Sequence, residues 1–105
     1  MKPLHSFLPK DNTKSLRILG LSQTVGMRSG LVALAPGDDV GAHSTENNEE
    51  LLIILDGKGR LEIESSGIEV SANETVYIPP NTRHNVLNTG STPLRYIYVV
   101  TQVRG

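Results

Sequence analysis

The stretch from Gly37 to Gly57 constrains the fold more than any other part of this 105-residue chain. Its sequence is GDDVGAHSTENNEELLIILDG, so a polar, turn-forming segment leads into an apolar run, Leu51 to Leu55. Asn47 and Asn48 favour a two-residue hairpin turn, because asparagine tolerates the positive φ that tight hairpins require. We therefore expect the chain to fold back at these two residues and to continue as a buried strand.

This hairpin would bring together side chains that can bind a metal ion. Thr45 would lie opposite Glu50, and His43 would lie opposite Leu52. Residues opposed across a hairpin share one face of the sheet. An imidazole and a carboxylate are therefore expected to converge at the mouth of the apolar strand, which is how a metal site can be built on a sheet.

The same stretch resembles the first motif of the cupin superfamily. That motif is usually a Gly, five residues, His-x-His, three or four residues, Glu, six residues and Gly. Here Gly37, His43, Glu50 and Gly57 fall at those spacings. Thr45 stands at the position where the second histidine is expected.

A later segment resembles the second cupin motif, Gly-x5-Pro-x-Gly-x2-His-x3-Asn. Asn73, Pro79, Asn81, His84 and Asn88 occur at its spacings. Asparagine replaces glycine at 73 and 81, which still permits a left-handed backbone conformation. The two motifs stand in the family's order, so the resemblance says much about the fold and little about the substrate.

Short runs of strand-forming residues between turn signals predict an all-β domain. No helical period of useful length is present. The main expected strands are Leu16–Leu21, Met27–Ala35, Leu51–Leu55, Arg60–Glu64, Ile68–Val70, Thr75–Ile78, His84–Asn88 and Leu94–Val103. For such a pattern, the cupin resemblance implies a double-stranded β-helix, or jelly-roll barrel.

Composition bounds the organisation of the chain. Residues 1–15 are polar and contain two prolines, so we expect an arm that lies along a partner or the barrel edge, followed by one barrel domain over residues 16–105. The net charge of −1, with scattered basic residues, gives no indication of a nucleic-acid partner. No apolar run reaches the about 20 residues of a membrane span, and no signal-peptide pattern is visible, so a cytoplasmic location is expected.

The absence of cysteine means that any transition metal must be held by histidine and carboxylate. The cupin resemblance implies that His43, Glu50 and His84 coordinate one divalent ion, Fe, Mn, Ni or Zn, inside the barrel. Thr45 is a candidate fourth position. The alternative is a pocket that holds no metal.

Four further polar residues are candidates for ligand contacts. Tyr96 and Tyr98 share a strand face and either line the pocket or serve as core aromatics. Asn88 either contacts a ligand or supports the turn that follows it. Arg83 and Arg60 could meet an acidic substrate, but solvated surface charge is the favoured interpretation for both.

Two functions remain open at this point, beside a purely structural role for a dimeric barrel. The resemblance implies a small metal-dependent enzyme, with dioxygenase, decarboxylase, isomerase or lyase chemistry on a small oxygen-rich substrate. The alternative is a non-catalytic module that binds or senses a sugar or a small acid. A homodimer is also expected, because small cupins commonly pair and Leu51–Leu55 is apolar on both faces.

Overall fold

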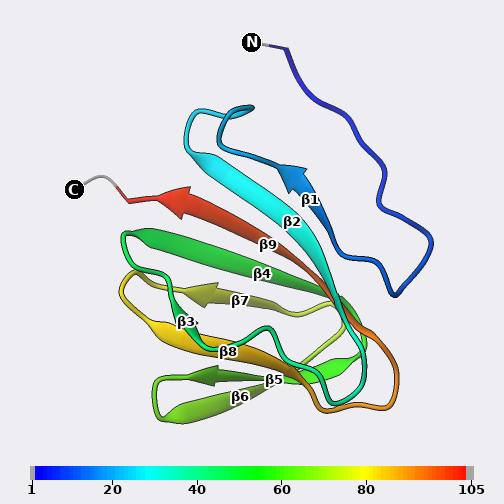
Figure 1. Ribbon diagram of the computed structural model, residues 1–105. Helices are drawn as coiled ribbons and strands as arrows, with labels where there is room; N and C mark the ends of the chain where they lie inside the picture. Colours follow the sequence, from blue (N-terminus) through cyan, green and yellow to red (C-terminus); the bar gives the residue numbers. More distant parts are fainter. Residues whose placement is uncertain (1, 104–105) are drawn as a thin grey trace.

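A computed structural model describes residues 2–103 of the chain and shows nine β-strands, with no helix among these residues (Figure 1). Met1, Arg104 and Gly105 lie outside the described residues. The strands are β1 Leu16–Leu19, β2 Met27–Leu34, β3 His43–Ser44, β4 Asn48–Asp56, β5 Lys58–Ile63, β6 Ser66–Ser71, β7 Thr75–Ile78, β8 Arg83–Asn88 and β9 Leu94–Gln102. The predicted all-β class is confirmed, and all eight of the main predicted strands are present.

The strands form two sheets that face each other, drawn as the upper and lower layers of Figure 1. The larger sheet has the order β1-β2-β9-β4-β7, and the smaller one has the order β3-β8-β5-β6. Every pairing is antiparallel, and the chain passes repeatedly from one sheet to the other. This arrangement is the predicted jelly roll.

The core lies between the sheets and consists of every second residue of the inward-facing strands. The largest side chains that are almost completely buried in it are Leu52, Ile54, Leu61, Ile78 and Leu94. Burial of each such side chain contributes about 1.5–3 kcal/mol. The inner face of the larger sheet is apolar along most of its length and becomes polar only near one end, at the row that contains Glu50.

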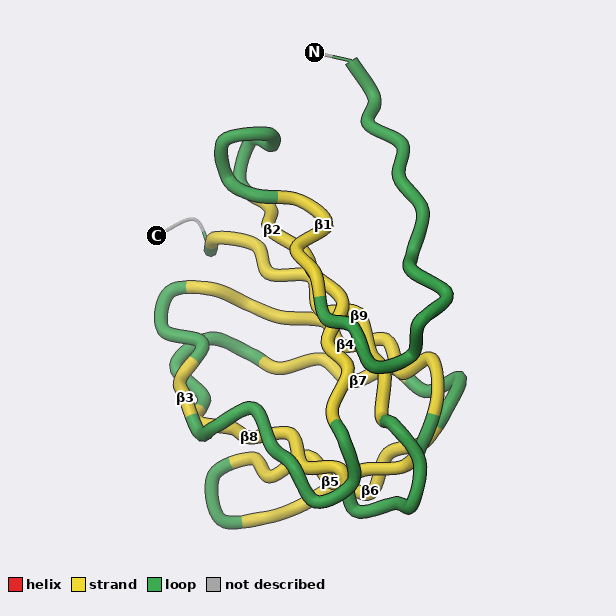
Figure 2. Tube along the Cα trace, turned by 45° about the vertical axis from the view of Figure 1, so that its right-hand side comes forward, coloured by secondary structure: helices red, strands yellow, loops and turns green. Residues whose placement is uncertain are grey.

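The segment before β1 lies outside the two sheets (Figures 1 and 2). Residues 2–15 contain no strand. Two hydrogen bonds connect the second half of the arm to the larger sheet. Pro9 O accepts one from the Arg95 guanidinium (3.2 Å), and Ser15 Oγ accepts one from Ala33 N–H (2.9 Å). Phe7 in the arm is 83% exposed.

The described residues contain no helix of the length and hydropathy that a membrane span requires.

The predicted hairpin at Asn47-Asn48 is wrong. His43 pairs with His84 in the smaller sheet, whereas β4 lies in the larger sheet between β9 and β7. A turn does occur here, with Asn48 N–H donating to Thr45 O (3.0 Å), but it carries the chain from one sheet to the other. Local turn propensity predicted the position of the turn correctly. The pairing of β4 is decided by its long contacts with β7 and β9, which are more extensive than a hairpin with the two-residue strand β3 could be.

The expectation of left-handed backbone at the substituted motif positions is confirmed. Asn73 has φ 72° and Asn81 has φ 55°. Gly57, which lies between β4 and β5 where the chain changes sheets, has φ 90°. A Cβ atom at Gly57 would lie 2.5 Å from Pro93 O, so this position requires glycine for both its conformation and its space.

We predict that Gly57→Ala lowers the free energy of unfolding by more than Gly37→Ala. Both glycines have positive φ, 90° and 87°, so both substitutions carry a backbone strain of about 1–3 kcal/mol. Only at Gly57 does the added methyl group also meet a backbone carbonyl, because nothing lies within 4 Å of the corresponding position at Gly37. Urea denaturation of both variants measures the difference, and equal losses would show that the contact with Pro93 is not important.

Candidate metal centre

Three side chains that can bind a metal converge between the two sheets. His43 on β3 and His84 on β8 come from the smaller sheet, and Glu50 on β4 comes from the larger one. Their ligand atoms all lie within 4.8 Å of one another. His84 Nε2 is 3.4 Å from Glu50 Oε1, and the two imidazole ring centroids are 4.3 Å apart. The expected convergence is therefore found, although it results from facing sheets and not from a hairpin.

Both imidazoles are oriented by backbone carbonyl groups. His43 Nδ1 lies 2.9 Å from Gly41 O, and His84 Nδ1 lies 3.0 Å from Thr82 O. Because a carbonyl oxygen only accepts hydrogen bonds, each Nδ1 carries a proton. In the neutral imidazole this leaves the lone pair on Nε2, which is the tautomer that a metal-binding histidine needs.

The environment of His84 favours a positive charge. Its side chain is buried, and burial alone would lower its pKa by disfavouring the imidazolium. The contact with Glu50, the hydrogen bond to Thr82 O and the negative charge of Glu50 together outweigh that effect and raise the pKa of His84. A site that holds a proton between these two groups is also electrostatically suited to a metal cation.

Tyr96 provides a neutral hydroxyl close to the three candidate ligands. Burial raises the pKa of Tyr96, and the nearby charge of Glu50 and the Tyr98 side chain raise it further. The hydroxyl therefore stays protonated at physiological pH. It can donate a hydrogen bond to a ligand, but it is a poor general base.

A cavity of about 200 Å³ is lined by two of the three candidate ligands, His43 and Glu50. Its lining includes side chains from both sheets: Arg28, Val32, Val40, His43, Ser44, Thr45, Glu50, Tyr96, Tyr98 and Val100. Tyr96 and Tyr98 thus line the pocket, as one of the two interpretations of the sequence proposed. His84 is not among the lining residues and reaches the site through its contact with Glu50.

Arg28 and Val40 were not identified from the sequence. Arg28 is separated by even intervals from Val32 and Leu34 on β2, and both of these residues face the interior. Because every second side chain of a strand lies on the same face, this pattern could have placed Arg28 on the inner face. Val40 lies in the irregular segment before β3, where no periodicity exists to reveal it.

Asn88, which the sequence offered as a possible pocket residue, lies outside the cavity lining. Its Nδ2 donates to Leu34 O (2.9 Å) and Thr92 O (2.8 Å), and its Oδ1 accepts from Gly90 N–H (2.9 Å). Asn88 is buried and does not line the cavity. Its amide is used to hold the turn between β8 and β9, which is the structural alternative.

The two arginines considered as substrate contacts also lie outside the cavity lining. Arg60 forms an ion pair with Glu69 (3.0 Å) on the surface of the smaller sheet. Arg83 is exposed and precedes His84 on β8, so it points to the opposite face of the strand. Both positions fit the interpretation as surface charge.

Thr45 lines the cavity, but its hydroxyl is engaged by the protein backbone. Thr45 Oγ1 donates to Pro79 O (2.7 Å) and accepts a hydrogen bond from Thr82 N–H (3.0 Å). Thr45 N–H donates to Thr82 O (3.2 Å), the same oxygen that accepts from His84 Nδ1. At this position the chain therefore braces the loop that orients His84, and three protein side chains remain as candidate ligands.

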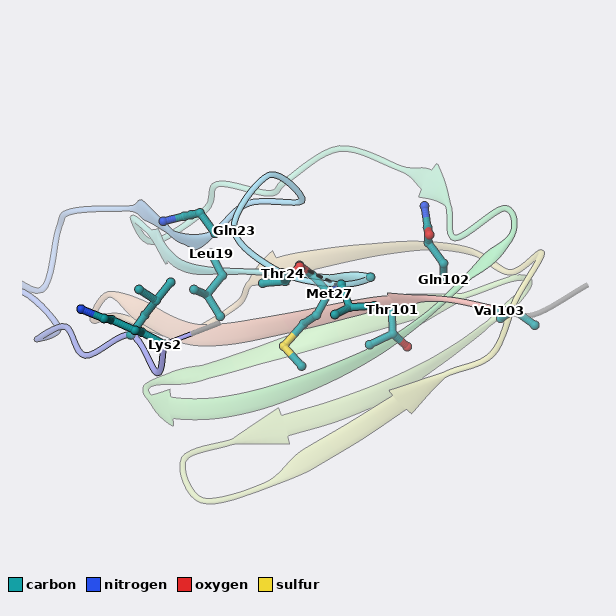
Figure 3. Close-up of a pocket in the computed structure, with 11 residues that line it drawn as sticks. Lys2, Leu19, Gln23, Thr24, Met27, Thr101, Gln102 and Val103 are labelled. Carbon is teal, nitrogen blue, oxygen red and sulfur yellow. Dashed lines mark hydrogen bonds between the residues drawn. The ribbon is translucent and has the colours of Figure 1, made fainter.

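A larger and more open depression lies elsewhere on the molecule (Figure 3). It measures about 830 Å³ and is formed by the arm, the loop between β1 and β2, and the end of β9. The labelled Lys2, Met27 and Val103 lie on its wall. No histidine, aspartate or glutamate is among the described residues that line it, so it offers no candidate metal ligand.

The jelly roll and the convergent imidazoles and carboxylate together define a β-barrel protein with a candidate metal site inside the barrel. Comparison with known proteins identifies the family. A cupin domain is matched over residues 30–100, which is more than half of the chain. The chain therefore belongs to the cupin family.

Individual relatives are similar to parts or all of the chain. The uncharacterised protein MJ1618 of Methanocaldococcus jannaschii is 30% identical over 93 residues, covering 87% of this chain and 74% of that protein. An oxalate-binding protein of Thermotoga maritima is 30% identical over 67 residues, 64% of this chain and 55% of its own length. The crystal structure of an RmlC-like cupin protein from Methanocaldococcus jannaschii superposes with a TM-score of 0.81 at 20% identity, covering 96% and 91% of the two chains, which supports the fold.

We predict that Thr45→Val destabilises the protein by about 1–3 kcal/mol, because it leaves the buried Thr82 N–H without its acceptor. Thr45→Ser is the matched control, since it keeps the hydroxyl and loses only one methyl group, worth about 0.8 kcal/mol. Chemical denaturation measures both. A valine variant at least as stable as the serine variant would contradict the bracing role.

Proposed function

We propose that this cupin binds a divalent metal ion through His43, Glu50 and His84 and uses it to act on a small oxygen-rich molecule in the adjoining cavity. The observation that carries the proposal is the convergence of the three donor groups within 4.8 Å, with both histidines held as the tautomer that offers Nε2. A largely buried carboxylate next to a buried imidazole is costly without a proton or a cation. A metal ion removes that cost.

The donor set narrows the choice of metal. Two imidazoles and one carboxylate suit Fe, Mn, Ni or Zn, and the chain has no thiolate to favour a softer ion. Three protein ligands leave coordination positions open for a ligand. When bound, such an ion would polarise a ligand oxygen or support oxygen chemistry, while Tyr96 would donate a hydrogen bond to the same ligand.

The first candidate is a metal-dependent enzyme that catalyses a dioxygenase, decarboxylase, isomerase or lyase reaction. The second candidate is a non-catalytic module that binds a sugar or a small acid. It is favoured by the absence of a separate acid or base among the described lining residues, where Tyr96 stays protonated. The similar protein of Thermotoga maritima is named as an oxalate-binding protein and not as an enzyme, and this chain spans about half of its length. A cytoplasmic location stays a prediction.

We also propose that the protein forms a homodimer through the outer face of the larger sheet. Leu51 on β4 lies between Val99 on β9 and Tyr77 on β7 in one row of that face. Leu51 is 38% exposed and Tyr77 is 56% exposed. A second copy covering this row would remove apolar surface from water, and a stable pair needs about 800 Å² from each partner.

The metal site is tested by calorimetric titration of Ni²⁺ and Mn²⁺ into protein purified without a histidine tag. We expect one ion per chain for the parent and at least a tenfold weaker affinity for His84→Ala, which equals about 1.4 kcal/mol. His5→Ala is the control, because His5 lies in the arm, outside the group of three. If His84→Ala binds the ion as well as the parent does, the site does not exist.

Acid should weaken metal binding in the same titration. The ion and a proton compete for His84 Nε2, and a raised pKa means that the proton begins to win at a higher pH than the ordinary value of 6.5 would give. Affinity should be fully developed above the raised pKa and should fall as the pH decreases through it. An affinity that does not change between pH 8 and about pH 5 would contradict ligation by imidazole.

The dimer is tested by light scattering at micromolar concentration. The parent should scatter as twice the 11.4 kDa chain, and Leu51→Glu should shift it toward the single-chain mass by burying a charge in the interface. Ile68→Glu is the control, because Ile68 is similarly exposed, at 44%, but lies on the other sheet. A parent that scatters only as a single chain would rule out the dimer.

A further inference from the structure

Arg28 and the candidate ligand Glu50 belong to one row across the inner face of the larger sheet. Arg28 on β2 is the register partner of Val100 on β9, and Val100 is also the partner of Glu50 on β4. Adjacent strands lie about 4.8 Å apart, so the backbones of Arg28 and Glu50 are roughly 10 Å apart across one intervening strand. Arg28, Val100 and Glu50 all line the 200 Å³ cavity.

The next rows along the sheet explain why the cavity opens at this row. Gly30 and Tyr98 are register partners, and a Cβ atom at Gly30 would lie 2.5 Å from the Tyr98 hydroxyl oxygen, so the tyrosine ring covers the glycine. Beyond them, Val32 pairs with Tyr96. The cavity is therefore bounded by aromatic rings on its inner side, and Arg28 stands at its outer end.

Arg28 is exposed to solvent at the rim of the cavity, and its guanidinium forms no ion pair within residues 2–103. Ion pairs in this part of the chain involve Arg60, Arg95 and His84, and no hydrogen bond from the Arg28 guanidinium is found there. Glu50 is the one carboxylate among the cavity lining residues, and it already faces His84. With a divalent ion bound, the cavity would hold an excess of positive charge.

We propose that Arg28 is the anchor for a carboxylate group, so that the ligand of this site is a small organic acid held between the metal ion and the Arg28 guanidinium. The proposal rests on the metal site proposed above and specifies which oxygen-rich molecules that site takes. A guanidinium binds a carboxylate through two parallel hydrogen bonds, which gives orientation as well as charge recognition. One oxygen group of the acid would face the ion, and a second would face Arg28.

The size of the cavity limits the acid to a short one. A volume of about 200 Å³ corresponds to roughly seven water molecules at about 30 Å³ each, which is less than a typical drug-sized pocket. An acid of about seven non-hydrogen atoms fits this volume. Malonate is a suitable probe, and malonamide is its neutral counterpart of nearly the same shape.

The test is a calorimetric titration of malonate and of malonamide into protein loaded with Ni²⁺, with the retained Ni²⁺ measured afterwards. We expect Arg28→Gln to weaken malonate binding at least tenfold while leaving Ni²⁺ affinity and malonamide binding unchanged. Arg83→Gln is the matched control, because Arg83 is exposed like Arg28 but lies outside the cavity lining. Arg28→Lys should fall between the parent and Arg28→Gln, because a lysine keeps the charge without the paired hydrogen bonds.

Malonate affinity that is equal in the parent and in Arg28→Gln, with Ni²⁺ retained, would overturn the proposal. Malonamide binding as tight as malonate binding would overturn it too. If no Ni²⁺ binds to the parent, the proposed metal site fails on its own, and the same malonate titrations are made on the metal-free proteins. Binding that then depends on Arg28 supports the carboxylate anchor, and binding that does not depend on Arg28 overturns it.

Discussion

The contact between Glu50 and His84 is the interaction on which the site depends, because it joins the two sheets through polar groups inside an apolar sandwich. Neither group can be buried alone without a large cost in free energy. The protein meets this cost by placing an imidazole with a raised pKa against the carboxylate, and by bringing a second imidazole to the same point. The three groups are thus arranged around a positive charge, whether a proton or a metal ion supplies it.

The fold and the three candidate ligands could be predicted because the spacing of residues along the chain resembles the two cupin motifs. Asparagines at left-handed positions, strand alternation and the intervals within each motif are all visible in the sequence itself. The pairing of β4 could not be predicted in this way, since it depends on partners far along the chain. The predicted hairpin brought His43 and Glu50 together within one sheet, whereas the structure brings them together from two facing sheets. Alternation along a strand fixes which face a residue occupies, but it does not fix which sheet lies opposite that face.

Thr45 shows how one substitution changes the chemistry of a site without removing the site. A histidine at this position would be a ligand, whereas the threonine hydroxyl is bound to Pro79 O and Thr82 N–H and supports the loop that orients His84. At this position a group that supports the orientation of His84 thus stands where a coordinating group is expected. An ion held by three protein ligands leaves more positions for an exogenous ligand than an ion held by four.

The rows of the larger sheet connect stability to selectivity. The rows that contain Leu94, Ile54 and Leu52 are packed and supply the buried apolar area that holds the sheets together. Only the row of Arg28, Val100 and Glu50 carries charges on the inner face, and the cavity lies beside it. Glu50 in this row contacts His84 from the smaller sheet, and in our proposal a metal ion and Arg28 select the ligand. The two charged residues that would recognise a ligand, Arg28 and Glu50, thus lie outside the apolar cluster that holds the two sheets together, so a change in ligand recognition need not disturb that cluster.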